Sequence, residues 1–354
     1  MALVLPIQGM SQNQQQPLTA SGARAGHIPI GLLLSDLSQT NIIKAAELAI
    51  DQANAAGAYK NQQFKLLIRT ADGFWGAGSK ESVSLVYEDQ VRAIIGSLDG
   101  RNGHLAEQVA TKSHLCYIET NATEPTLSQA FVPWFMRVVP NDNQQAVAIL
   151  DQIEREGDGT IGILSTENYD TRYAVKSLTK EVARKSGMPP LVLDLDPATI
   201  QQSDVIEKIL SSHLDHLVIP FDALYLKDLI EALRKKIPDL LIYGTLHFTM
   251  GVESRKDAWG SYEGVYMLRP YFNRDSYPSL PDSRSAYMYD AVNLVINAIH
   301  QVGTNREAIT DYLSKSSYSK GITGSITFDE LGNRQGATTL IRIQNGEPIL
   351  IKHP

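Results

Sequence analysis

The feature that most constrains this chain is a repeated alternation of short apolar runs with amphipathic helical patterns. Apolar runs typical of buried strands occupy residues 28–34, 64–69, 91–95 and 115–118, and helical patterns occupy residues 42–56, 79–89 and 104–112. Strands separated by helices in this way pair in parallel, and the helices cover both faces of the sheet. The sequence therefore predicts a doubly wound α/β fold for this part of the chain.

The same alternation restarts after a link at residues 137–142. Helices are predicted at 142–156, 171–186, 204–212 and 224–236, and strands at 159–164, 191–193, 217–220 and 240–244. Two later helices are predicted at 285–302 and 306–315, followed by antiparallel strands at 324–328 and 338–343 around the turn-forming residues 329–334. A chain of 354 residues exceeds the usual size of one hydrophobic core, so two domains are expected.

Two polar loops follow consecutive predicted strands in the stretch 91–140. The first covers residues 97–103, before a helix expected from His104, and the second covers residues 119–125. Ser, Thr, Asn and Gly at the carboxyl edge of a parallel sheet can present backbone N–H groups and hydroxyls to a small ligand. The same residue types are preferred helix caps. The pattern alone therefore fits either a ligand cradle or ordinary capping.

Charge and apolar patterning exclude two classes of partner. A formal net charge of -7 lacks the excess of Lys and Arg that phosphate backbones require, so no nucleic-acid partner is expected. No apolar run approaches the roughly 20 residues that span a bilayer. Residues 1–27 contain a polar tract and are interpreted as a tail or linker. They form a poor secretory signal because no basic residue precedes Arg24. The sequence thus leaves open a cytoplasmic protein or a mature exported form.

Catalytic and metal-binding patterns are missing from the sequence. It has no Walker loop, nucleophile elbow or HExxH motif, and the glycines of residues 73–78 lack the GxGxxG order after a strand. The single cysteine, Cys116, lies in a predicted buried strand, so an intrachain disulfide and a thiolate metal site are excluded. His213 and His216 have a metal-capable spacing without a third ligand, and are interpreted as surface histidines at a helix end. No enzyme, metal or cofactor is expected.

Several short motifs occur in one specific order. They are Ile28–Leu33 with the helix at 45–54, the strand end Ile94–Gly96, Ala122–Leu127 before Phe135–Asp142, Ala286–Val292, and Gly321–Arg334. With these motifs, residues 28–350 resemble the type I periplasmic binding proteins, specifically the leucine/isoleucine/valine-binding branch that serves ABC importers.

This resemblance implies two Rossmann-like lobes joined by three crossing segments, with a ligand cleft between the lobes. The crossings would fall near residues 138–141, 269–272 and 322–326. Lobe one would comprise residues 28–140 plus 271–323, and lobe two residues 141–270 plus 324–354.

The implied function is capture of an amino acid or related small carboxylate by hinge closure for an ABC importer, in the periplasm or outside the cell. Its partners would be the small-molecule ligand and the permease subunits of the transporter. The alternative is a ligand-sensing regulatory domain of the same fold that is not coupled to transport.

Carried over position by position, the resemblance implies a ligand site made of residues that follow strand ends. These residues are Ser35, Ser38, Asp99, Gly100, Arg101, Asn102, Asn121, Ala122, Thr123, Tyr169, Phe221, Asp222, Leu246 and His247. Thr123 would hold a ligand carboxylate, and Asp222 or Asp99 would meet an ammonium group. Arg101 replaces a small hydroxyl residue of the family and either pairs with a carboxylate or points to solvent. Tyr169 resembles a tyrosine that closes over the ligand.

Two departures from the family pattern concern the rim of the cleft. The loop 35–41 is short and lacks an aromatic residue that often covers the ligand. Between residues 271 and 285, Pro278 and Pro281 stand where the family usually has a complete helix. Proline in a helix interior costs about 3 kcal/mol, so this helix is expected to be absent.

Overall fold

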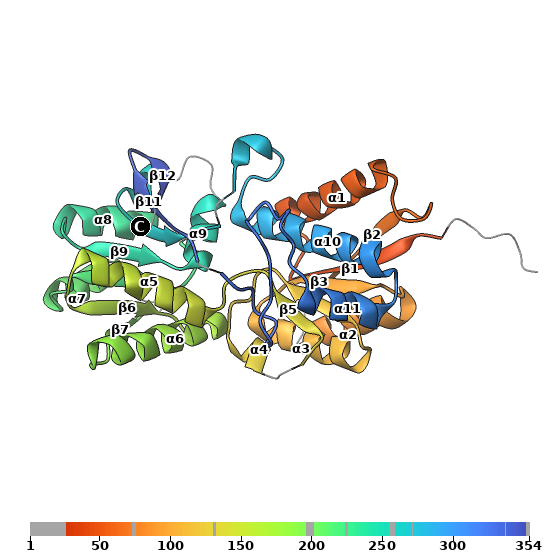
Figure 1. The fold of residues 1–354 in the computed structure, drawn as a ribbon. Coiled ribbons are helices and arrows are strands. Elements are labelled where there is room, and N and C mark those ends of the chain that lie inside the picture. Colours follow the sequence, from red (N-terminus) through yellow and green to blue (C-terminus); the bar gives the residue numbers. More distant parts are fainter. Residues whose placement is uncertain are drawn as a thin grey trace, which may run out of the picture.

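The structure is a computed structural model that describes residues 26–72, 76–129, 132–195, 202–223, 226–254, 259–270, 272–336 and 338–351. The described chain forms two lobes side by side (Figure 1). One contains a five-stranded sheet in the order β2-β1-β3-β4-β5, and the other a seven-stranded sheet in the order β12-β11-β10-β9-β8-β6-β7. The predicted α/β class with two doubly wound lobes is confirmed.

All pairings in the five-stranded sheet are parallel, as the alternation of strands and helices predicts. Its strands are β1 (Ile28–Leu34), β2 (Phe64–Thr70), β3 (Ala93–Ser97), β4 (Cys116–Glu119) and β5 (Phe135–Arg137). The helices along the same part of the chain are α1 (Thr40–Ala55), α2 (Ala77–Val83), α3 (Gly100–Lys112) and α4 (Thr126–Gln129), with a π-helical stretch at Ser84–Glu88 that continues α2. Cys116 is fully buried in β4, as predicted.

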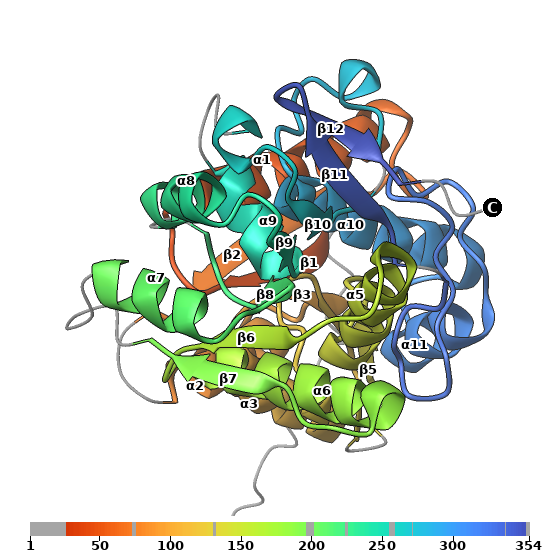
Figure 2. The same ribbon diagram turned by 90° about the vertical axis from the view of Figure 1, so that its left-hand side faces the viewer.

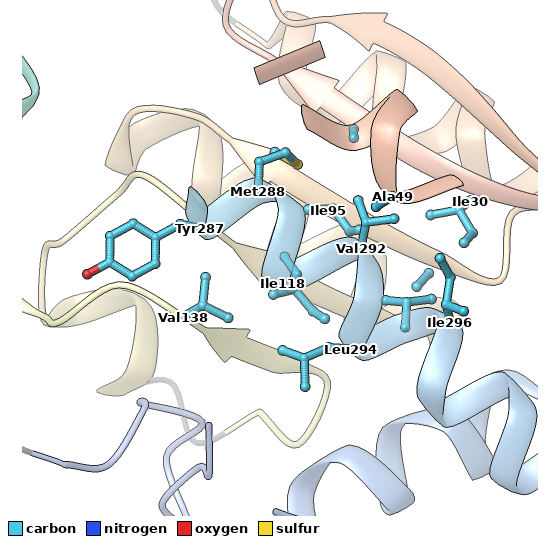
Figure 3. Packing of buried hydrophobic residues seen from close by; sticks show 14 of the residues in the cluster. Ile30, Ala49, Ile95, Ile118, Val138, Tyr287, Met288, Val292, Leu294 and Ile296 are labelled. Atoms are coloured by element: carbon cyan, nitrogen blue, oxygen red, sulfur yellow. The ribbon is translucent and has the colours of Figure 1, made fainter. Parts of the chain in front are cut away.

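Two late helices, α10 (Ser283–Val302) and α11 (Arg306–Lys315), return to this first lobe. In Figure 1 they lie with α1 on the same lobe, although more than 200 residues separate α1 from α10. Apolar side chains of α10, including Met288 and Val292, pack in one core cluster with Ile30, Ile95 and Ile118 of the sheet (Figure 3). This packing explains why the sequence predicts a helix near residue 285 without a local strand partner.

The second lobe contains the remaining strands and helices. Its strands are β6 (Ile161–Ser165), β7 (Leu191–Asp194), β8 (His216–Ile219), β9 (Leu241–Gly244), β10 (Tyr266–Leu268), β11 (Leu340–Gln344) and β12 (Glu347–Leu350). Its helices are α5 (Asp142–Glu156), α6 (Tyr169–Ser186), α7 (Gln202–Ser211), α8 (Lys227–Lys236) and α9 (Leu246–Glu253), with short 3-10 turns at Trp259–Tyr262 and Arg274–Ser276. Figure 2 shows α5 and α6 on one side of the sheet and α7, α8 and α9 on the other.

Three stretches connect the lobes. Residues 138–141 lead from β5 into α5, residues 269–282 lead from β10 into α10, and residues 316–339 lead from α11 into β11. Residues 271 and 337 of these stretches lie outside the described residues. In the second stretch, the described residues between 272 and 282 contain a single 3-10 turn and no α-helix. The sequence prediction that the prolines remove this helix is confirmed.

The end of the chain differs from the prediction. Residues 324–328 do not form a strand, because Ile326 and Phe328 make only isolated bridges to Tyr318 and Arg334. β11 instead pairs antiparallel with β10 on one side and with β12 on the other, and the tight turn between β11 and β12 has Asn345 and Gly346 at positive φ. The prediction of a strand at 324–328 was therefore wrong. Its β-branched residues line a connection between lobes rather than a sheet.

Three local predictions also need correction. α3 begins at Gly100 rather than at His104, because the side chain of Asp99 caps it by accepting a hydrogen bond of 2.8 Å from the backbone N–H of Asn102. Asn168 caps α6 in the same way, so Tyr169 lies inside that helix. His216 is not a surface histidine at a helix end. It is buried in β8, with its ring nitrogens near the Tyr243 hydroxyl and the carbonyl of Gly157.

Candidate functional site

The N-terminus of α3 in the first lobe faces the N-terminus of α6 in the second. The backbone N–H of Gly100 donates a hydrogen bond of 3.0 Å to Oδ1 of Asp170. A Cβ atom at Gly100 would lie 2.6 Å from the carboxyl carbon of Glu124 and 2.8 Å from Oδ1 of Asp170. A larger residue at position 100 would therefore push the lobes apart, and glycine is required by close approach.

The carboxyl group of Asp170 sits in a polar environment built from both lobes. Burial raises its pKa, while His247 and the N–H of Gly100 oppose that shift, and the carboxyl groups of Asp99 and Glu124 add to it. Asp170 thus joins a cluster of acidic groups between the lobes, in which His247 supplies a favourable charge interaction.

Arg101 and Tyr169 form a second contact between the same helix ends. The guanidinium carbon of Arg101 lies 5.1 Å from the centre of the Tyr169 ring, a cation–π distance, and Arg101 is otherwise exposed. Burial raises the pKa of Tyr169, and the nearby side chains of Tyr173 and Glu124 add to this shift. Arg101 is thus exposed to solvent and also contacts Tyr169 of the opposite lobe. The pairing of Arg101 with a ligand carboxylate stays a prediction.

His247, in the first turn of α9, and Asn121, in the loop after β4, form a third contact between the lobes. Nε2 of His247 lies 3.0 Å from the backbone oxygen of Asn121. The side-chain amide of Asn121 in turn donates to the carbonyl of Leu98, across to the loop after β3. The neighbouring Leu246 is buried, and its N–H donates to the side chain of Gln145.

Among the other predicted residues, Asp222 also bridges the lobes, whereas Phe221, Ser35 and Ser38 make their contacts within one lobe. Asp222 is exposed, with an oxygen 3.6 Å from a guanidinium nitrogen of Arg284 at the start of α10, and Phe221 packs against the core of the second lobe. Ser35 hydrogen-bonds to the carbonyl of Ser97 through both its N–H and its hydroxyl. The N–H and hydroxyl of exposed Ser38 hydrogen-bond to the carboxylate of Asp36.

A buried carboxylate, Glu119, shapes both polar loops of the first lobe. One of its oxygens accepts hydrogen bonds from the backbone N–H groups of Leu98, Thr120, Asn121 and Ala122, at 2.7 to 3.3 Å. Its other oxygen accepts from the hydroxyl of Tyr117. Burial raises the pKa of Glu119 in spite of these donors. Because the four N–H groups come from the loops after β3 and β4, Glu119 fixes their relative position.

A buried arginine, Arg137, braces the same loop from the other side. It donates to the carbonyls of Ala122 and Glu124, to the hydroxyl of Ser128 and to the side chain of Asn333. Burial lowers the pKa of Arg137 to about 10. Asn333 belongs to the stretch that connects the lobes after α11, so Arg137 ties the loop after β4 to that connecting stretch.

Thr123, the predicted carboxylate ligand, has its hydroxyl engaged within the protein. It forms a hydrogen bond with the side chain of Asp142 at the start of α5, and its carbonyl accepts from the backbone N–H of Asp142 at 2.8 Å. Burial raises the pKa of the fully enclosed Asp142 to about 7, although Thr123 and Arg137 favour its charged form. Thr123 therefore links the cleft loop to the first crossing segment.

Comparison with known proteins identifies the family. A family model described as periplasmic binding protein matches residues 28–347. The chain belongs to the type I periplasmic binding protein family. As a periplasmic binding protein, it superimposes on the isoleucine complex of LivJ from Streptococcus pneumoniae with a TM-score of 0.76 and 20% identity, over 92% of this chain and 100% of that one. A benzoate-bound solute binding protein from Rhodopseudomonas palustris gives a TM-score of 0.78 and 15% identity, over 92% and 96% of the two chains.

Curated relatives of this periplasmic binding protein include plant receptors. Glutamate receptor 3.1 of Oryza sativa subsp. japonica is 30% identical over 108 residues, which are 30% of this chain and 11% of the receptor. Glutamate receptor 3.7 of Arabidopsis thaliana is 28% identical over 147 residues, which are 40% of this chain and 16% of that receptor. The matches thus span less than a fifth of the length of these relatives.

Sequence reasoning missed several residues at the meeting point of the lobes in this periplasmic binding protein. Asp170, Glu119, Arg137 and Arg284 were not among the predicted residues. Asp170 follows a capping asparagine, and its position next to Tyr169 is a signal in the sequence that could have identified it. Glu119 has no such signal, because a glutamate at the end of a strand is common. Among the described residues, no group of three or more His, Cys, Asp or Glu side chains could hold a metal ion. In the same ranges, no helix is long and apolar enough to cross a membrane.

Proposed function

We propose that this protein is a solute-binding protein that captures an amino acid or a related small carboxylate by hinge closure and presents it to an ABC importer. The proposed lobes are residues 28–140 plus 271–323 and residues 141–270 plus 324–354, with residues 1–27 as a tail. The proposed location is the periplasm or the outside of the cell, and the proposed partners are the ligand and the permease subunits. Binding rather than catalysis is the proposed activity.

The observation that carries the proposal is that polar groups at strand ends of both lobes meet. The pairs Gly100–Asp170 and Asn121–His247 each join one lobe to the other at 3.0 Å. Residues at the carboxyl edges of parallel sheets are the usual ligand positions in doubly wound folds. A ligand that touches both sets of loops would be held by residues such as Asp99, Tyr169 and Asp222.

The nature of the ligand is inferred from the backbone N–H groups at the N-terminus of α3 and from the ligands of similar proteins. Solved structures of similar fold hold isoleucine, leucine and benzoate, all of which carry a carboxylate. A carboxylate could accept hydrogen bonds from the N–H groups at the N-terminus of α3, where the helix dipole also favours an anion. It would have to displace the carboxylate of Asp170 from the N–H of Gly100.

Hinge closure follows from selection between two arrangements of the lobes. A ligand that contacts both lobes binds the closed arrangement better and shifts the population toward it. The three connecting stretches would absorb the rotation, as in other proteins that close around a ligand.

A thermal-shift screen over amino acids and aromatic acids tests the proposal. A true ligand at a hundred times its Kd should add about 2.7 kcal/mol to the free energy of unfolding. Small-angle scattering should show a smaller radius of gyration with that ligand than without it. If no amino acid or aromatic acid stabilises the protein, or if a saturating ligand leaves the radius of gyration unchanged, the result would count against ligand capture by hinge closure.

The second candidate function is a ligand-sensing regulatory domain. Its support comes from the curated relatives, which carry the name of glutamate receptors and share only a segment with this chain. The described residues 272–282 lack the complete helix that the transporter family usually has there. Loss of this helix would alter a docking surface for a permease. Pull-down of ABC permease subunits by the ligand-bound protein would favour the first candidate. Capture of a signalling protein in their place would favour the second.

A further inference from the structure

A cavity of about 320 Å³ lies among the three stretches that connect the lobes. Its walls come from Val138 and Pro140 of the first stretch, from the last residue of β10 and residues 269–270 of the second stretch, and from residues 323–325 and 334–336 of the third. Among the predicted cleft residues, Leu246 is the one that also lines it. The cavity is therefore built from the hinge and is distinct from the candidate cleft. Its volume reaches the lower end of the range for small-molecule sites.

The described lining of this cavity carries positive charge and hydrogen-bond donors. Two arginines, Arg269 and Arg334, line it together with amide and hydroxyl side chains, and no aspartate or glutamate is among the described lining residues. In a protein with net charge -7, such a wall is unusual. It selects against cations and for a small anion.

Arg269 supplies an unused donor in this wall. Only 7% of the residue is exposed, and its Nε atom donates to Oε1 of Glu253 at 2.7 Å. The ring of Phe272 lies 5.0 Å from the guanidinium carbon. Nη2 of Arg269 is buried and has no hydrogen-bond partner within the protein. Leaving a buried charged donor unpaired costs stability, so a rotation of the guanidinium that brings Nη2 to the cavity and to a partner from outside the chain would lower the free energy.

Arg334 connects the same cavity to the hinge. Its guanidinium donates to the hydroxyl and carbonyl of Thr323 at 2.8 Å, and to the carbonyls of Ser325 and, at 3.4 Å, Val138. It therefore joins the first and third connecting stretches. Tyr287, another lining residue, belongs to the core cluster of α10, and in Figure 3 its ring lies at one end of that cluster, on the side of Val138.

We propose that this hinge cavity binds a small organic carboxylate, at a site separate from the cleft. A planar guanidinium with a free nitrogen matches the geometry of a carboxylate, and the hydroxyl and amide groups of the wall can satisfy its remaining lone pairs. Because all three connecting stretches line the cavity, an occupant contacts parts that move relative to one another when the lobes rotate. The occupant therefore changes the equilibrium between open and closed lobes, and by linkage it changes the affinity of the cleft.

Isothermal titration of the full chain with succinate tests this inference, with sulfate as a comparison anion. We expect saturable binding of one succinate with a Kd tighter than about 1 mM. Thr338→Trp, which fills the cavity from its rim and leaves the Arg269–Glu253 pair intact, should abolish it. The matched control Gln344→Trp, on the exposed end of β11 outside the cavity, should bind succinate as the wild type does.

Two further variants separate the cavity from the cleft. The double variant Arg269→Gln with Glu253→Gln keeps a hydrogen-bonded pair but removes both charges, and it should lose succinate while its circular dichroism stays native. His247→Ala, in the cleft, should keep succinate binding. Loss in His247→Ala together with retention in both cavity variants would overturn the inference and leave the proposed cleft function standing. Absence of succinate binding to the wild type, or binding of sulfate alone, would also overturn it.

Discussion

Oδ1 of Asp170, in the second lobe, accepts a hydrogen bond of 3.0 Å from the backbone N–H of Gly100, in the first. A carboxylate of the protein thus occupies the N-terminus of α3, where the proposed function would place the carboxylate of a ligand. The side chain of Asp170 acts as an internal competitor in this arrangement. It also helps to hold the lobes together without a ligand.

Replacing Asp170 with alanine should therefore have two effects. The radius of gyration of the ligand-free protein should increase, because a contact between the lobes is lost. The affinity for a carboxylate identified by the thermal-shift screen should rise, because the N–H of Gly100 no longer has to be vacated. Small-angle scattering and calorimetry measure the two effects. Glu167→Ala, an exposed neighbour, is the control, and weaker carboxylate binding by Asp170→Ala would show that Asp170 is itself a ligand contact.

The buried carboxyl of Asp142 should make stability depend on pH. Its pKa is raised from 3.8 to about 7, so its contribution is fully present below pH 3.8 and is lost as pH rises through about 7. The loss would reach at most about 4 kcal/mol, since a tenfold change in a protonation equilibrium corresponds to about 1.4 kcal/mol. Urea unfolding of the wild type and of Asp142→Asn between these pH values measures it. As pH rises, the unfolding free energy of the wild type should fall relative to that of Asp142→Asn. A difference that stays constant with pH would contradict the argument.

His104 should stay protonated well above neutral pH. Its ring lies 3.4 Å from Glu107 and 2.6 Å from Glu124, and a hydrogen bond to Glu107 followed by one to Glu124 raises its pKa to about 9. Its contribution to stability is present below pH 6.5 and is lost as pH rises through 9. An NMR titration of the imidazole, assigned by comparison with His104→Gln, should give a midpoint near that value. Glu107→Gln should lower the midpoint, and a wild-type midpoint at or below 6.5 would refute the assignment.

Glu119→Gln should loosen the two cleft loops. Loss of the carboxylate weakens the hydrogen bonds to the N–H groups of Leu98 and of residues 120–122, and buried groups that lose such partners cost about 1–3 kcal/mol. Urea unfolding should detect that loss, whereas exposed Glu330→Gln should stay within about 0.5 kcal/mol of the wild type. Amide hydrogen exchange should accelerate at the four N–H positions. Unchanged exchange there would mean that the loops hold their shape without Glu119.

Arg101→Ala distinguishes the predicted pairing with a ligand carboxylate from a role through the contact with Tyr169 that the structure shows. If Arg101 acts through its contact with the ring of Tyr169, an exposed cation–π pair worth about 0.5–1 kcal/mol is lost, and ligand affinity falls by about two- to fivefold. Tyr169→Leu should then cause a similar loss, and the two losses should not add in the double variant. If Arg101 pairs directly with the ligand carboxylate, the loss should exceed a hundredfold and be confined to acids.

Much of the architecture could be predicted because it depends on local patterns. The apolar run at Ile28–Leu34 and the amphipathic pattern of α5 define elements that the structure has at almost the same bounds. The prolines at 278 and 281 exclude a helix through backbone geometry alone. By contrast, α9 and β10 were missed, because α9 has apolar residues nearly all round and β10 has only three residues. Periodicity gives little signal in either case.

The candidate site was predictable in its loops and not in its contacts. Polar residues after β3 and β4 are visible in the sequence. The role of Asp170, however, depends on its hydrogen bond with Gly100, which lies 70 positions earlier in the chain. Likewise, the local sequence around Glu119 does not reveal that one of its carboxylate oxygens accepts hydrogen bonds from four backbone N–H groups of two loops. Contacts of this kind depend on how the sheets are placed, which no local pattern encodes.

The connection between Arg137 and Asn333 constrains the order in which the molecule can be made. The guanidinium of Arg137 is fully enclosed, and one of its partners is supplied 196 positions later in the chain. The core of the first lobe also needs α10, and the sheet of the second needs β11. A nascent chain emerging from the ribosome can thus finish neither lobe until the residues of α10, Asn333 and β11 have been synthesised. During synthesis, both half-built sheets would expose apolar surface, so binding by a chaperone before release would have a direct benefit.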